Sequence, residues 1–174
     1  MVENELSFLV RTMPPLAGIP HKDIDQHYLS DGEEPLRIRR SGGTFELTKK
    51  LTIDRNDLSR KEEINVPLDR EEYYMLLPLA KRGLAKTRYY LRLDGGLTAE
   101  LDVFKGPLDG LAMVEVEFRD DASRKAFTPP DWFGRDVSQE AWSSNSNLAG
   151  KTFYDIRAHA GTRKAKKTKS VGKK

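Results

Sequence analysis

The sequence predicts an α+β fold organised around a many-stranded, mostly antiparallel β-sheet. Three observations support this prediction. Short segments alternate polar and apolar residues, which is the pattern of half-buried strands. Helical stretches with capping residues interrupt these segments. In several segments one face is apolar and the other is charged, so helices that cover the apolar faces leave the charged faces to solvent or to the interior of a curled sheet.

Seven segments have the alternating pattern of strands. They are Glu3–Val10, Leu36–Arg40, Thr44–Leu51, Arg60–Val66, Ala85–Leu93, Thr98–Phe104 and Met113–Phe118. Between the fifth and the sixth stands Gly95-Gly96. Because glycine readily adopts positive φ angles, this pair predicts a hairpin turn.

Three helical stretches are predicted between or after the strands. Asp69 is a suitable N-cap for a helix over Asp69–Gly83, and Gly83 is a suitable stop. A second helix is expected over about Asp120–Phe127, because a Pro-Pro pair follows it. A third is expected to start at Ser138.

Length and composition limit the classes of protein that fit. The chain has 174 residues, of which 37% are hydrophobic, and this suits one globular domain. Without cysteine there is no disulfide, thiolate metal site or cysteine nucleophile. No P-loop or dinucleotide-binding glycine motif is present. No apolar run is long enough to span a membrane and the start does not resemble a signal peptide, so we expect a cytoplasmic protein.

The basic residues are concentrated at the end of the chain. Residues 157–174 contain eight Lys or Arg and no acid, which leaves 22 basic and 27 acidic residues in residues 1–156. We therefore predict one domain over 1–156 and a disordered basic tail over 157–174. Such a tail either keeps the protein soluble or contacts polyphosphate, nucleic acid or an acidic partner without specificity.

Charged residues share a strand face in five of the predicted strands, and a sixth pairs Thr48 with Lys50, because residues two apart point the same way. These pairs are Glu3 and Glu5, Arg37 and Arg39, Thr48 and Lys50, Lys86 and Arg88, Glu100 and Asp102, and Glu115 and Glu117. One interpretation is an ordinary wet sheet face with cross-strand ion pairs. Because each strand carries charges of one sign, a second interpretation is favoured, in which basic strands hold a polyanion and acidic strands hold Mg²⁺ or Mn²⁺. Together they indicate a metal–polyphosphate site.

Other residues give weaker signals. His21 and His27 lie in a region with several prolines and glycines, and surface or local hydrogen-bonding roles fit them better than a metal site. The aromatic residues of Asp131-Trp132-Phe133-Gly134, together with Trp142, are interpreted as packing residues.

Several motifs, in one order, resemble those of the CYTH domains, or triphosphate tunnel metalloenzymes, and especially their small bacterial members. The resemblance covers Val2 to about Ala149. The motifs are Glu3-Asn4-Glu5-Leu6-Ser7-Phe8-Leu9-Val10, Gln26-His27-Tyr28-Leu29, Arg37-Ile38-Arg39, Leu47-Thr48-Lys49-Lys50, Lys86-Thr87-Arg88-Tyr89, Glu100-Leu101-Asp102-Val103-Phe104-Lys105-Gly106, Gly110-Leu111 with Glu115-Val116-Glu117-Phe118, and Phe127 to Val137.

Two positions depart from the family pattern. Ser7 stands where the opening motif has Lys, which removes one positive charge. The R-x-E-x-E strand of the family reads Arg60-Lys61-Glu62-Glu63-Ile64, so that Glu62 is expected to face the interior and Glu63 the outside.

The resemblance implies a closed antiparallel tunnel of about eight strands, and metal-dependent hydrolysis of a triphosphate, most simply of inorganic tripolyphosphate to diphosphate and phosphate. By the same resemblance, Mg²⁺ or Mn²⁺ is the cofactor. The implied substrate-binding residues are Arg37, Arg39, Lys50, Lys86 and Arg88. The implied metal ligands are Glu3, Glu5, Glu62, Glu100, Asp102, Glu115 and Glu117. The implied catalytic residues are Lys50, Glu62 and Asp102.

Alternatives to tripolyphosphate hydrolysis remain open at this point. Related proteins include thiamine triphosphatases and adenylate cyclases. A module that binds polyphosphate with little turnover, because of Ser7, is a second possibility. Either a monomer or a homodimer is compatible with the sequence.

Overall fold

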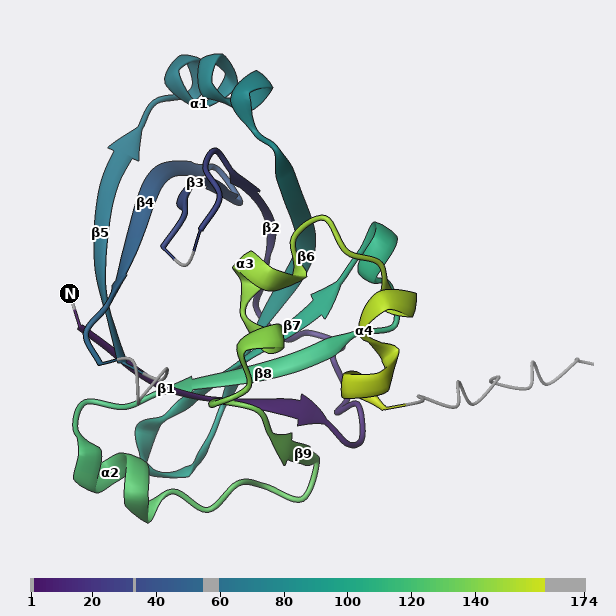
Figure 1. Ribbon diagram of the computed structural model, residues 1–174. Helices are drawn as coiled ribbons and strands as arrows, with labels where there is room; N and C mark the ends of the chain where they lie inside the picture. The colour runs from purple at the N-terminus through teal and green to yellow at the C-terminus, as the bar shows by residue number, and fades with distance from the viewer. Residues whose placement is uncertain (1, 33, 55–59, 162–174) are drawn as a thin grey trace, which may run out of the picture.

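Nine antiparallel strands form one strongly curved sheet around an interior space (Figure 1). The computed structural model describes residues 2–32, 34–54 and 60–161, with the backbone alone at residues 2, 3, 60 and 61. The strands are β1 (Val2–Val10), β2 (His21–Tyr28), β3 (Leu36–Ser41), β4 (Thr44–Thr52), β5 (Arg60–Leu68), β6 (Arg82–Arg92), β7 (Thr98–Phe104), β8 (Ala112–Glu117) and β9 (Phe133–Asp136). The predicted α+β class is confirmed.

The strand order is β5-β4-β3-β2-β6-β7-β8-β1-β9. A further pairing joins β5 to β1, with Val2 opposite Glu62 and Asn4 opposite Arg60. The two flanks of the curved sheet therefore meet at the start of the chain, and β9 adds to the other part of β1.

The seven predicted strands correspond to β1 and β3–β8, whereas β2 and β9 were not predicted. In β2 the buried positions are Ile24, Gln26 and Tyr28. Gln26 interrupts the apolar alternation, because glutamine is a polar residue. It can nevertheless be buried, since its Nε2 donates to the Tyr28 hydroxyl at 2.6 Å. In this strand the buried face is identifiable only after the sheet has formed.

The helices are short, and α3 carries residues that line the interior space, whereas α1, α2 and α4 lie at the periphery of the sheet (Figure 1). They are α1 (Arg70–Leu76), α2 (Asp121–Ala126), α3 (Asn145–Leu148) and α4 (Phe153–Ala160). Short 3₁₀ turns are η1 (Leu77–Leu79), η2 (Asp94–Gly96), η3 (Gly106–Leu108) and η4 (Ala141–Ser143). Within the described part of the chain, no helix combines the length and apolar character needed to cross a membrane.

The predicted cap of the first helix is confirmed, but its predicted end is wrong. Asp69 caps α1 in a reciprocal arrangement with Glu72, and the helix ends at Leu76. Pro78 then stands in η1, where proline cannot supply the N–H that a longer helix needs.

Gly83, the predicted stop, lies in β6 instead. A Cβ atom there would come within 2.5 Å of His27 Nδ1 and 3.0 Å of the Gln26 carbonyl oxygen. The glycine therefore permits the close approach of β2 and β6, which no local helix signal could reveal.

The third predicted helix does not begin at Ser138. Instead, η4 begins at Ala141 and α3 at Asn145, because the Ser138 Oγ accepts a hydrogen bond from the Ser7 N–H at 2.9 Å. The first four residues of the predicted disordered tail, 157–160, belong to α4. The remainder of that tail, 162–174, lies outside the described residues.

The apolar cores lie on the outer face of the sheet, as the strand parity predicted. One cluster includes Phe8, Leu101, Val114, Val116 and Phe118, packed with the aromatic side chains that precede β9. The other includes Leu108 and Ile156 and lies beneath α3 and α4. Trp132 and Trp142 pack against these clusters, so the interpretation of both as packing aromatics is confirmed.

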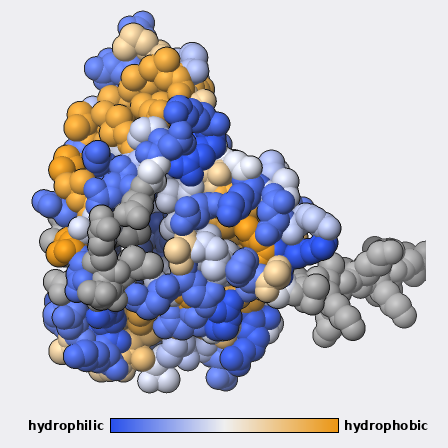
Figure 2. Space-filling view, viewed as in Figure 1, coloured by the Kyte–Doolittle hydropathy of each residue, from blue (hydrophilic) through white to orange (hydrophobic). Residues whose placement is uncertain are grey.

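Apolar side chains also reach the molecular surface. Figure 2 shows them gathered over α1 and the adjoining strands. Among them, Met75 is 70% exposed, and Ile64 and Val66 on β5 are each 48% exposed. The inner face of the sheet, by contrast, is largely polar and charged.

Candidate active site

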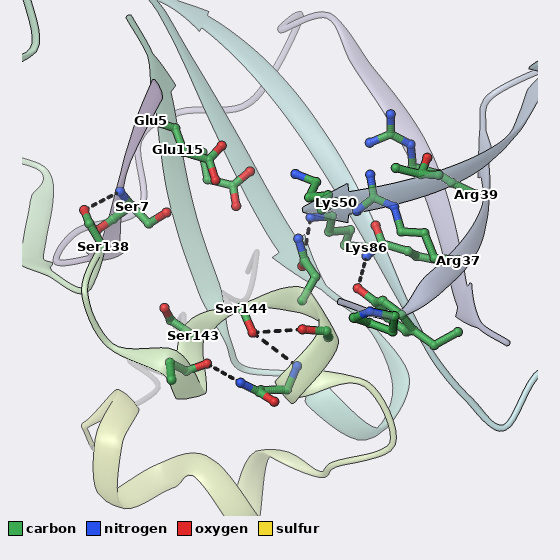
Figure 3. A pocket seen from close by; sticks show the side chains of 18 of the residues that line it. Glu5, Ser7, Arg37, Arg39, Lys50, Lys86, Glu115, Ser138, Ser143 and Ser144 are labelled. Carbon is green, nitrogen blue, oxygen red and sulfur yellow. Dashed lines mark hydrogen bonds between the residues drawn. The ribbon is translucent and has the colours of Figure 1, made fainter. Parts of the chain in front are cut away.

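The curved sheet encloses a cavity of about 570 Å³ (Figure 3). Its charged lining residues are Glu5, Arg37, Arg39, Lys50, Lys86, Arg88, Glu100, Glu115, Glu117 and Glu140. Figure 3 shows Arg37 and Arg39 reaching in from one side, with Glu5 and Glu115 on the other. Apart from Glu140, all of these side chains share the inner face that alternation predicted.

The first part of the basic wall comes from β3 and β4. Glu63 Oε2 lies 3.0 Å from Lys50 Nζ and 3.5 Å from Arg37 Nη2, and Arg39 forms an ion pair with Glu46. The Nε–H groups of Arg37 and Arg39 are buried and have no hydrogen-bond acceptor within the described residues. An anionic ligand supplies the acceptors that such donors lack.

The second part of the basic wall comes from β6 and is held by Asp102 on β7. Arg88 donates to both Asp102 oxygens at 2.7 Å, and Lys86 Nζ lies 2.5 Å from Asp102 Oδ2. Glu100 and Glu115 form further ion pairs with Arg88. This bidentate pairing fixes the planes and directions of the cations that face the cavity.

Asp102 is 1% exposed and does not line the cavity. Because both of its oxygens already accept from Lys86 and Arg88, it orients those cations from behind. Its role as a ligand of a metal ion or of an attacking water molecule stays a prediction.

The prediction for Glu62 and Glu63 is wrong. Glu62 is exposed and lies opposite Leu51, whereas Glu63 lies opposite Lys50 and is 9% exposed in its ion pairs with Lys50 and Arg37. The register with β4 decides which carboxylate faces inward, and a motif compared along one strand does not contain that register.

The acidic wall comes mainly from β1 and β8. Glu5 lies directly opposite Glu117, and both line the cavity. Like charges in such a cross-strand pair repel one another unless a cation lies between them. Glu3, the other predicted ligand on β1, lies opposite Lys61 in the backbone register, and its side chain is outside the described residues.

The carboxylate oxygens of the cavity suit a hard divalent cation. The described side chains contain no cluster of three metal-ligating groups. Mg²⁺ commonly takes one or two carboxylates and completes its coordination with water and substrate phosphates, so Glu5 and Glu117 fit such an ion when a phosphate ligand is present.

Burial and neighbouring charges change the ionisation of these groups in different directions. Burial alone would raise the pKa of Glu115, but Arg88, Lys86 and Lys50 outweigh it and lower that pKa to about 2. Burial raises the pKa of Glu100 and lowers the pKa of Lys86, in each case against the opposing effect of ion-pair partners. The carboxylate of Glu115 therefore stays ionised at neutral pH.

Sequence reasoning missed two parts of the lining. One is Gln26 and Tyr28 on β2, where burial raises the pKa of the Tyr28 hydroxyl. The other is a segment rich in serine and asparagine that follows β9. Its lining residues are Ser138, Glu140, Ala141, Ser143, Ser144, Asn145, Ser146 and Asn147. Only its composition marked this segment, because it lacks the alternation and charge pairs of the strands.

Ser7, where the resemblance expects Lys, lines the cavity opposite Glu115. Its backbone N–H donates to Ser138 Oγ and its carbonyl accepts from the Val137 N–H at 2.8 Å. The backbone at this position therefore anchors the start of the Ser/Asn-rich segment.

Comparison with known proteins agrees with this geometry, although no family model matches the chain. The chain is 38% identical over 154 residues to a protein from Nitrosomonas europaea named inorganic triphosphatase, covering 86% of this chain and 97% of that protein. It is 30% identical over 128 residues to an inorganic triphosphatase from Acetivibrio thermocellus, covering 73% and 79% of the two chains.

Solved structures show the same fold. A crystal structure of an inorganic triphosphatase matches with a TM-score of 0.64 at 34% identity, over 84% of this chain and 93% of that one. A putative adenylate cyclase from Bacillus halodurans matches with a TM-score of 0.52 at 17% identity, over 90% and 96% of the chains, which shows shared fold alone. The order of the motifs, the charged interior and these relatives together show that the chain belongs to the CYTH, or triphosphate tunnel, family, among its inorganic triphosphatases.

Proposed function

We propose that this protein hydrolyses inorganic tripolyphosphate to diphosphate and phosphate in a closed tunnel of eight strands, with Mg²⁺ or Mn²⁺ as cofactor. The observation that carries the proposal is the meeting of a basic wall and an acidic wall in one cavity. The names of the two similar curated proteins support the reaction. The pairing of β1 with β5 supports closure, because it links the flanks of the sheet.

The basic wall would bind the phosphate chain. Arg37 and Arg39 present planar guanidinium groups that can each contact two phosphate oxygens, and Lys50 adds a point charge beside them. Asp102 holds Lys86 and Arg88 in place, so these cations require little rearrangement when substrate enters. Fixed positive charge of this kind stabilises the negative charge that develops as a phosphoryl group is transferred.

The acidic wall would hold the cation. Glu5 and Glu117 would be its protein ligands, with Glu115 beside them, although the Glu115 carboxylate also serves Arg88. A bound divalent cation would neutralise phosphate charge and orient the phosphate chain. Placing the two walls in one cavity lets one ligand contact both.

The lining favours an inorganic chain over a nucleotide or thiamine triphosphate. Among the described residues, Tyr28 is the only aromatic side chain that lines the cavity, and its hydroxyl accepts from Gln26. A heterocyclic ring usually stacks on aromatic side chains, and this lining offers little for it to stack on.

The test is phosphate release from tripolyphosphate, ATP and thiamine triphosphate, each with Mg²⁺, with Mn²⁺ and with excess chelator. Of the three substrates, we expect only tripolyphosphate to be hydrolysed fast, and we expect this hydrolysis to depend on the metal. Glu117→Gln should reduce it about 100-fold, because an amide is a much poorer ligand for a hard cation. Glu62→Gln, which changes an exposed carboxylate, is the matched control and should stay within about twofold of wild type.

Two outcomes would contradict the proposal. Full activity in excess chelator would show that hydrolysis does not need a metal ion. Binding of tripolyphosphate without phosphate release would indicate a module that binds polyphosphate with little turnover. The replacement of the motif Lys by Ser7 is the feature of the sequence that favours this alternative.

A further inference from the structure

Asn145 joins the Ser/Asn-rich segment to the basic wall. It is the first residue of α3 and lines the cavity, and its side-chain oxygen Oδ1 lies 3.2 Å from Lys86 Nζ. The two residues are 59 positions apart in the chain. Through this contact an uncharged side chain lies directly beside a cation that the proposed substrate would use.

The chemistry of the contact fixes which way the amide points. A lysine ammonium group only donates hydrogen bonds, so the atom of Asn145 that faces Lys86 must be the oxygen. The two N–H donors on Nδ2 therefore point away from Lys86, and no acceptor for them is found within the described residues. A side chain that lines the cavity thus retains hydrogen-bond donors for a ligand.

Other contacts hold the backbone of Asn145 in place without its side chain. Leu148 is fully buried in the core beneath α3. Arg82 donates to the Ser146 carbonyl oxygen, and the Gly150 N–H donates to the Gly83 carbonyl oxygen at 3.2 Å. Before Asn145, the Ser143 Oγ donates to the Val137 carbonyl oxygen at 3.1 Å, so contacts on both sides hold the backbone that presents the amide to the cavity.

We propose that Asn145 is a substrate-binding residue, whose Nδ2 donates to an oxygen of the same phosphate group that Lys86 binds. The inference rests on the proposed function and adds a neutral donor to its basic wall. An uncharged donor suits this position: a carboxylate here would neutralise Lys86 and repel phosphate oxygens, whereas the amide keeps the positive charge available and adds a hydrogen bond.

The experiment compares Asn145→Asp and Asn145→Ala with Asn147→Asp. Asn147 also lines the cavity, but its Nδ2 donates to the Ala141 carbonyl oxygen, and its side chain contacts no cation among the described residues. Asn147→Asp is thus a control for adding one negative charge to the same segment. The readouts are KM and kcat for tripolyphosphate, binding of tripolyphosphate without added metal by calorimetry, and the melting temperature.

We expect Asn145→Ala to raise KM and the dissociation constant about tenfold, the loss of one hydrogen bond to a charged group. Asn145→Asp should raise both about 100-fold, while its melting temperature stays at or above that of wild type, because the new carboxylate pairs with Lys86. A merely structural role would not combine weaker binding with unchanged or higher stability. Asn147→Asp should change KM by no more than about threefold.

The wild-type protein tests the proposed function, and the variants test the role of Asn145. If wild-type protein neither binds nor hydrolyses tripolyphosphate, the proposed function fails. If wild type is active but Asn145→Asp and Asn147→Asp raise KM equally, or Asn145→Ala leaves KM and the dissociation constant within twofold, the role of Asn145 is overturned. Should Asn145→Asp fail to fold, Asn145→Ala alone decides between these outcomes.

Discussion

Glu62 and Glu63 are adjacent carboxylates in opposite environments. Glu62 is exposed on the outer face of β5, whereas Glu63 is 9% exposed and contacts Lys50 and Arg37. Asn65 also donates to Glu63 Oε1 at 2.6 Å. The inner carboxylate therefore holds two cations of the basic wall at a fixed separation, as Asp102 does for Lys86 and Arg88.

Replacing Glu63 by glutamine should destabilise the empty protein. The amide cannot neutralise Lys50 and Arg37, and removing one partner of a buried ion pair leaves uncompensated charge, at a cost of about 2–3 kcal/mol here because Lys50 is partly exposed. Urea unfolding of Glu63→Gln, monitored by circular dichroism, measures this loss.

Glu62→Gln is the control, since it makes the same chemical change one residue away on the exposed face, and it should stay within about 0.5 kcal/mol of wild type. Added tripolyphosphate should reduce the difference in unfolding free energy between Glu63→Gln and wild type, because the ligand supplies the missing negative charge. Equal stability of the two variants would contradict the inward position of Glu63.

At the scale of elements, the segment from Ser138 through α3 acts as one wall of the cavity because its ends are tied to the rest of the fold. The Ser7 N–H bonds Ser138 at its start, and Leu148 enters the core at its end. Side chains between these anchors, Ser143 and Ser144 among them, reach the cavity (Figure 3). The stability of the wall therefore depends on a core residue that does not touch the cavity.

Truncation of that core residue tests the dependence. Leu148→Ala removes a fully buried side chain and should cost about 2–5 kcal/mol of unfolding free energy. It should also raise KM for tripolyphosphate, because the wall that carries Asn145 loses its anchor. Leu79→Ala, the same change at a position that is 64% exposed in η1, should alter stability by less than about 0.5 kcal/mol. Urea unfolding and steady-state kinetics of both variants check this, and a stable Leu148→Ala protein with normal KM would disprove it.

For the whole molecule, the two walls are electrostatically connected across the interior. Arg88 on β6 and Lys50 on β4 both act on Glu115 of β8, whose pKa is lowered to about 2 despite its burial. Folding brings these strands together, so this interaction exists only in the folded protein.

Stability should consequently fall in acid. A carboxyl group with a lower pKa in the folded state stabilises the fold above its unfolded-state pKa, and this contribution is lost as the pH falls through the folded-state value. For Glu115 the window runs from 4.5 down to about 2. The wild type should lose on the order of 2–3 kcal/mol more than Glu115→Gln across it. Urea unfolding at several pH values measures the difference, and parallel curves for the two proteins would refute the assignment.

In most strands, residue spacing alone was enough to predict which side chains face the interior. Side chains alternate along any strand, so the shared faces of Arg37 with Arg39 and of Lys86 with Arg88 follow from their spacing. Local signals also placed the cap at Asp69 and the start of the second helix near Asp120. These features depend on residues close together in the chain, which is why no structure was needed to predict them.

The other features of the site could not be predicted in this way, because each depends on a partner far away in the chain. The register with β4, rather than the local motif, places Glu63 inside and Glu62 outside. Burial between strands makes Asp102 a support for two cations. Asn145 contacts Lys86 only because the sheet curves and the segment after β9 packs against it. The two residues are 59 positions apart, and no periodicity in the sequence predicts this contact.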